Sequence, residues 1–60
     1  GVILAPISND PKLSEKITEL RSEGRVVISC PERELKDREI MRELRASFTL
    51  VLASGEWIVI

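Results

Sequence analysis

Residues 2–28, VILAPISNDPKLSEKITELRSEGRVVI, hold the pattern that decides the fold. They open with Val2-Ile3-Leu4-Ala5, an unbroken apolar run closed by Pro6, which is typical of a strand covered on both faces. Asp10 suits a helix N-cap, and Pro11 suits the first helical position because its missing N–H would have no helical partner there. The chain is therefore predicted to begin with a strand followed by a helix.

The same stretch predicts where this helix ends and a second strand begins. Apolar residues recur at the spacing of one helical face at Leu13, Ile17 and Leu20. Gly24 follows, and glycine ends helices at low cost because it readily adopts a left-handed conformation. Val26-Val27-Ile28 is β-branched and does not alternate with polar residues, which predicts a second buried strand.

The middle of the chain predicts a second helix from about Asp37 to Ala46. Its apolar positions are Ile40, Met41 and Leu44. An earlier start stays open, because Ser29-x-x-Glu32 resembles a capping box. Residues 31–36 are then either a loop or a frayed first turn.

The end of the chain predicts a hairpin. Phe48 to Ala53 is strand-like, Ser54-Gly55 is a two-residue turn signal, and Trp57-Ile58-Val59-Ile60 is the returning strand. The element order β-α-β-α-β-β favours a small three-layer α/β domain with a mixed sheet. Three strands should be parallel and the last antiparallel, in the order 2-1-3-4, with one helix on each face.

Length and composition exclude several classes of protein. Sixty residues make a single domain, residues 1–60. Nine basic residues against ten acidic ones give a net charge of −1, whereas a nucleic-acid-binding module normally has a basic excess. The lone Cys30 cannot form an intrachain disulfide, which fits a reducing, cytoplasmic compartment. No apolar run approaches the length of about 20 residues that a membrane helix needs.

No catalytic residue, cofactor site or metal site is predicted. The sequence has no histidine, so the commonest general base and metal ligand is missing. Cys30 therefore has no histidine to lower its pKa, and a structural thiol is the favoured interpretation. The sequence contains no phosphate-binding glycine motif and no metal-ligand spacing.

A polar loop is the first candidate site. Ser8, Asn9 and Asp10 follow the first strand, at the carboxyl edge where open α/β sheets place ligands. Together with the helix N-terminal amides, they would suit a small polar or anionic group. Because Asp10 would repel an anion, plain helix capping is the favoured interpretation.

Two further surfaces are candidate interfaces. Arg38, Arg42 and Arg45 are spaced as one face of the second helix and could contact carboxylates of a partner or phosphates of RNA. A solvated face is the favoured alternative. The strand Trp57-Ile58-Val59-Ile60 falls at the sheet edge without a charge or proline to block pairing, so we expect a partner to cover it.

Several segments together resemble a known family. They are Ile3-Leu4-Ala5-Pro6, Asp10-Pro11-x-Leu13, Ile17-x-x-Leu20-Arg21-x-x-Gly24-x-x-Val27 and Leu50-Val51-x-x-x-Gly55-x-Trp57-x-Val59. The element order is similar to the anticodon-binding domain of class II aminoacyl-tRNA synthetases. Within that group the chain more closely resembles the C-terminal domain of the ATP phosphoribosyltransferase regulatory subunit, a paralogue of histidyl-tRNA synthetase.

The resemblance implies a non-catalytic domain excised from a longer cytoplasmic subunit. That subunit would associate with a catalytic subunit in the first step of histidine biosynthesis and take part in feedback control by histidine. The implied partners are the rest of the subunit, the catalytic subunit or a second copy. The short apolar runs predict no membrane partner, and the balanced charge disfavours nucleic acid. A tRNA anticodon-binding module and an unrelated structural or oligomerisation domain stay open as alternatives.

Overall fold

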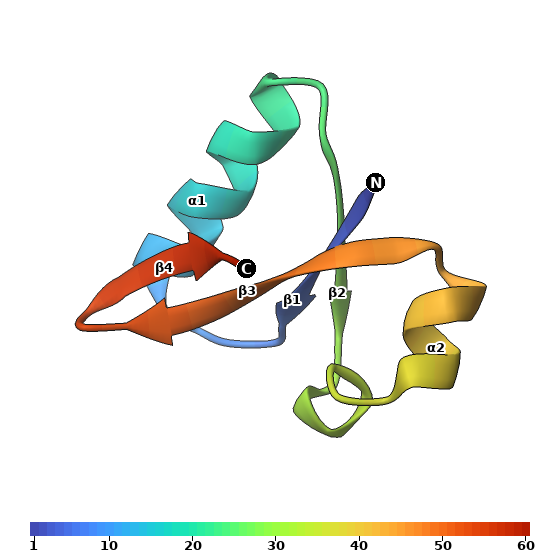
Figure 1. Ribbon diagram of the computed structural model, residues 1–60. Coiled ribbons are helices and arrows are strands. Elements are labelled where there is room, and N and C mark those ends of the chain that lie inside the picture. The colour runs from blue at the N-terminus through green and yellow to red at the C-terminus, as the bar shows by residue number, and fades with distance from the viewer.

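The computed structural model describes residues 1–60 and contains the predicted succession of elements (Figure 1). The elements are β1 (Val2–Pro6), α1 (Pro11–Ser22), β2 (Val26–Cys30), a 3₁₀ turn η1 (Glu32–Glu34), α2 (Arg38–Glu43), β3 (Ala46–Ala53) and β4 (Glu56–Val59).

The four strands form one sheet in the order β2-β1-β3-β4, which confirms the predicted topology. β1 is parallel to both β2 and β3, and β4 is antiparallel to β3. Ile3 lies opposite Val27 on one side and Phe48 on the other. Helix α1 covers the face of the sheet that carries Ile3 and Val27, and α2 contacts β3.

Helix α1 begins and ends where its local signals predict. The Asp10 carboxylate accepts a hydrogen bond from the backbone N–H of Lys12 at 2.9 Å, and Pro11 occupies the first helical position. Gly24 has a φ of +85°, a conformation that glycine adopts without the penalty of a Cβ. The amides of Gly24 and Arg25 donate to carbonyls of the last turn, at 3.0 and 3.2 Å, and satisfy that helix end.

The main core lies between α1 and the sheet. Two buried leucines of α1 pack against alternate residues of the strands, because side chains in a strand alternate between its two faces. This cluster consists of Ile3, Ala5, Leu13, Leu20, Val27 and Leu50, with Ile17, Phe48, Trp57 and Val59 packed around it. Leu4 points to the opposite face by the same alternation and is also fully buried.

Strand β2 differs from the prediction of a strand buried on both faces. Its first residue, Val26, is 55% exposed, and Ile28 is half-buried. β2 is an edge strand, whereas α2 lies beside the start of β3, an inner strand (Figure 1). The face of β2 opposite α1 is therefore only partly covered.

Helix α2 starts as predicted and ends early. Asp37 caps it by accepting hydrogen bonds from the amides of Glu39 and Ile40 at 2.9 and 3.3 Å. The helix ends at Glu43, so the predicted extension to Ala46 is wrong. Arg45 has a φ of +57°, a left-handed conformation that closes the helix, and Ala46 already belongs to β3.

The segment before α2 forms the short turn η1 and does not extend that helix. Ser29 lies in β2 and makes no capping hydrogen bond, and no side chain caps η1. The possible capping box of Ser29 and Glu32 is therefore absent. Pro31 precedes η1 in an extended conformation, with a ψ of 146°.

Candidate functional site

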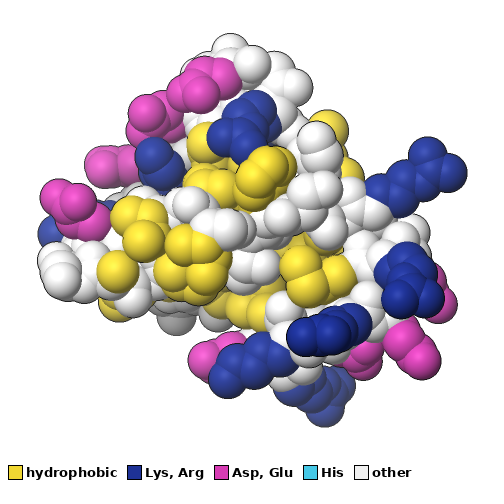
Figure 2. Space-filling view, viewed as in Figure 1, with side chains coloured by type: hydrophobic (Ala, Val, Ile, Leu, Met, Phe, Trp, Pro, Cys, Tyr) yellow, Lys and Arg dark blue, Asp and Glu magenta, His cyan; other side chains and the backbone are white.

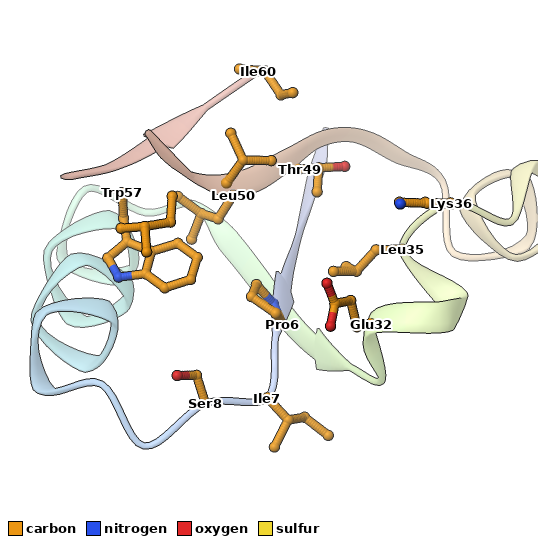
Figure 3. Close-up of a pocket in the computed structure, with 12 residues that line it drawn as sticks. Pro6, Ile7, Ser8, Glu32, Leu35, Lys36, Thr49, Leu50, Trp57 and Ile60 are labelled. Carbon is orange, nitrogen blue, oxygen red and sulfur yellow. The ribbon is translucent and has the colours of Figure 1, made fainter. Parts of the chain in front are cut away.

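A hollow lies beyond the carboxyl end of β1. Leu4 lies opposite Thr49 and β1 ends at Pro6, whereas β3 continues to Ala53, so the β3–β4 hairpin projects past β1. The space left there has a volume of about 650 Å³ (Figure 3). We call it the β1-end hollow, and its lining residues are Pro6, Ile7, Ser8, Glu32, Leu35, Lys36, Thr49, Leu50, Val51, Leu52, Trp57 and Ile60.

This position is the place where open α/β sheets bind ligands. β1 sits between β2 and β3, so the chain winds away from β1 in both directions and leaves a crevice at its carboxyl end. The β1–α1 loop, η1 and the residues after it, and the β3–β4 hairpin form the walls of the hollow. The hollow therefore lies at the same edge of the sheet as the predicted polar loop.

The lining is mainly apolar, with a few polar groups. Ser8 and Thr49 provide hydroxyls, and Glu32 and Lys36 provide one charge of each sign. Ile7 is 70% exposed and Ile60 is 65% exposed at its margin. Apolar side chains outnumber these polar groups, so the lining suits an apolar group.

The three residues of the predicted polar loop have different positions in the structure. Ser8 lines the hollow and its hydroxyl accepts a hydrogen bond from the Asp10 amide at 3.1 Å. Both carboxylate oxygens of Asp10 are engaged elsewhere, one by the Lys12 amide and the other by the indole N–H of Trp57 at 3.0 Å. Asn9 is exposed and is not among the residues lining the hollow. Asp10 is therefore bonded as a helix cap.

The bond between Trp57 and Asp10 ties the hairpin to the start of α1. The indole N–H is the first cause that lowers the pKa of Asp10, and the Lys12 amide is the second. A donor that bonds to a carboxylate favours its charged form. Sequence reasoning missed this contact because 47 positions separate the two residues.

Cys30 is a buried thiol. Burial raises the pKa of Cys30, and the nearby charge of Glu34 raises it further. The thiolate is the nucleophilic form, so a raised pKa keeps this side chain unreactive. No group of three or more His, Cys, Asp or Glu side chains is placed to hold a metal ion.

The three predicted arginines do not form one helical row. Arg38 and Arg42 lie on α2, but Arg45 lies beyond its end, so that part of the expectation is wrong. None of them lines the hollow, and none forms an ion pair with an acidic side chain. Figure 2 shows basic and acidic side chains interspersed at the end of the molecule that carries α2.

The predicted interface strand lies at the sheet edge, and its side chains divide between the two faces. Trp57 and Val59 pack against the core under α1, whereas Ile58 and Ile60 project from the other face. Figure 2 shows apolar side chains gathered over the β3–β4 hairpin.

The wall of the hollow formed by Leu35 and Lys36 was also missed by sequence reasoning. Both residues fall in the stretch 31–36 that was predicted only as a loop or a frayed turn. Leu35 lies off the apolar stripe of α2 and is an apolar residue within a charged segment. That contrast is the one sequence signal that could have indicated a wall of the hollow here.

Neither helix has the length and the apolar run needed to cross a membrane.

Comparison with known proteins assigns the chain to a family. No curated protein matches the sequence significantly. A family model described as the ATP phosphoribosyltransferase subunit HisZ C-terminal domain matches residues 1–60, the whole of the chain. The chain belongs to the family of HisZ C-terminal domains, as its resemblance to the regulatory subunit of ATP phosphoribosyltransferase implied.

Proposed function

We propose that this chain is a non-catalytic, protein-binding domain of a regulatory subunit that supports ATP phosphoribosyltransferase in the first step of histidine biosynthesis. Family membership supports the regulatory subunit. The domain supplies contacts within the enzyme assembly, and the catalytic subunit carries the chemistry.

The β1-end hollow is the observation that carries this proposal. Its walls are mainly apolar and its margin includes Ile7 and Ile60, both mostly exposed to solvent. Exposed apolar surface around a crevice favours contact with another protein surface, because burial removes that surface from water. Glu32 and Lys36 add one charge of each sign, which would orient a protein segment without favouring a highly charged ligand.

The alternative of a tRNA anticodon-binding module has less support. Phosphate contacts dominate the affinity of nucleic-acid-binding proteins and require clustered basic residues. The chain carries a net charge of −1, and Lys36 is the only basic residue lining the hollow. Trp57 contributes the only aromatic ring there, and its N–H is already bonded to Asp10.

Photo-crosslinking in the purified assembly of regulatory and catalytic subunits tests the proposal. Benzoylphenylalanine at position 7 would place the probe at the margin of the hollow without disturbing the core, because Ile7 is 70% exposed. We expect crosslinks to a defined protein segment, identified by mass spectrometry. The same probe at Val26, an exposed apolar position on the opposite edge strand, is the matched control.

Two outcomes would contradict the proposal. One is an absence of protein crosslinks from position 7 above the level seen from position 26. The other is crosslinking from position 7 to RNA when tRNA is present. Either result would leave the hollow without the protein partner that the proposal requires.

A further inference from the structure

We propose that the free edge of β4 is an interface between two copies of this chain. The two β4 strands pair antiparallel about a two-fold axis at Ile58 and join two four-stranded sheets into one. Trp57 belongs to both surfaces: its side chain lines the β1-end hollow, whereas this edge uses its backbone groups, and the inference does not depend on the proposed function.

The backbone of β4 leaves hydrogen-bonding groups free at two alternate residues. Thr49 and Ile60 exchange two backbone hydrogen bonds, at 3.0 and 2.9 Å. Bonded pairs alternate along an antiparallel ladder, so Ile58 also bonds to β3, through its partner Val51. Trp57 and Val59 therefore direct their backbone N–H and C=O groups away from β3, along the edge of the sheet.

These two residues are spaced for self-pairing. A two-fold axis at Ile58 places Trp57 of one copy opposite Val59 of the other, and the reverse. Each such pair would then exchange two hydrogen bonds, and the two Ile58 residues would face each other as the closer, non-bonded pair. Ile58 is 40% exposed in the single chain, so this pairing would bury apolar surface as well. The outer residues of β4 include no lysine and no proline, the residues that commonly block edge pairing.

The charges beside the edge complement themselves under two-fold symmetry, which favours a second copy as the partner. A line of alternating charges on α1 flanks β4 next to Glu56 and Trp57, and it consists of Lys12, Glu15, Lys16 and Glu19. An interface with two-fold symmetry must complement itself. When two such helices run antiparallel, Lys12 faces Glu19 of the other copy, and Glu15 faces its Lys16.

Charge reversal and restoration test this arrangement most sharply. Sedimentation equilibrium of the chain should show a monomer–dimer equilibrium, with Lys12→Glu weakening the dimer about tenfold, since it turns two exposed ion pairs into like-charge contacts. The double variant Lys12→Glu, Glu19→Lys should restore dimerisation, because the swapped charges again complement each other. A double variant that is no better than Lys12→Glu alone would overturn the inference.

Hydrogen exchange measures the protection of each backbone amide along β4. Raising the protein concentration should slow exchange of the Trp57 and Val59 amides, while those of Ile58 and Ile60 stay slow at every concentration because they bond to β3. Chemical synthesis with an N-methyl group on Val59 removes one outward donor and keeps the side chain, and it should abolish the dimer while thermal melting shows a folded chain. A strictly monomeric chain at millimolar concentration, with concentration-independent exchange at Trp57 and Val59, would refute the proposal and leave the proposed function untouched.

Discussion

Replacing Leu50 with alanine should remove much of the stability of this domain. Leu50 lies in the middle of β3, is 1% exposed, and contacts the cluster that joins α1 to the sheet. Truncating a buried leucine costs about 2–5 kcal/mol, because it loses transfer free energy and leaves a cavity. At about 0.05–0.15 kcal/mol per residue, a chain of this length has a free energy of unfolding of about 3–9 kcal/mol. Leu50→Ala should therefore leave a substantial unfolded population at 37 °C.

Leu52 provides the matched control. It lies two residues further along the same strand on the same face, but it is 55% exposed. Leu52→Ala should cost about 1 kcal/mol or less, since more than half of the side chain is already in water. Urea denaturation followed by the fluorescence of Trp57, the only tryptophan, measures both variants. Equal losses for Leu50→Ala and Leu52→Ala would refute the placement of Leu50 inside the core cluster and of Leu52 outside it.

Three further predictions concern pH, the end of α1 and nucleic acid. The pKa of Asp10 lies below its ordinary value of 3.8 in the folded chain, so the stability that Asp10 contributes is present above that pH and is lost as pH falls below it. Asp10→Asn keeps a side chain that can cap the helix but cannot titrate. The urea concentration at the unfolding midpoint, measured from pH 2 to 6, should therefore fall less steeply toward low pH in this variant than in the parent chain. An equally steep fall in both would count against the bond to Trp57. Gly24→Ala should lower the free energy of unfolding by about 1–2 kcal/mol, because Gly24 has a φ of +85°. A Cβ at this position would meet no neighbouring atom, so the cost is backbone strain alone. An unchanged melting temperature would contradict this conformation. Filter binding at about 100 mM salt should show no tight tRNA complex, and a sub-micromolar Kd with a steep salt dependence would disprove this prediction.

The sequence was informative where the signals are local. Asp10 and Pro11 define the start of α1 through groups that act within a few residues, and Gly24 defines its end in the same way. The antiparallel direction of β4 followed from the short final turn, and the order 2-1-3-4 was the arrangement in which right-handed crossovers put one helix on each face. Each of these inferences needs only neighbouring residues or a general topological rule.

The sequence was least informative where distant segments decide the structure. Arg45 ends α2 in a left-handed conformation, and no glycine marks this position in the sequence. The helix predicted from the apolar positions was therefore too long, and the arginine row that depended on it was wrong. The β1-end hollow exists because β3 extends further than β1, a difference that appears only when the strands are in register. The Trp57–Asp10 bond likewise depends on bringing the hairpin against α1.

The dependence of ATP phosphoribosyltransferase activity on the concentration of the regulatory subunit tests the central claim most directly. If this domain supplies contacts and no chemistry, Ile7→Glu in the full regulatory subunit should raise the concentration that gives half-maximal activity and leave the plateau rate unchanged. Val26→Glu, at a similarly exposed apolar position away from the hollow, should leave both values unchanged. A lower plateau with an unchanged half-maximal concentration for Ile7→Glu would contradict the claim, because it would place the hollow in the catalytic step.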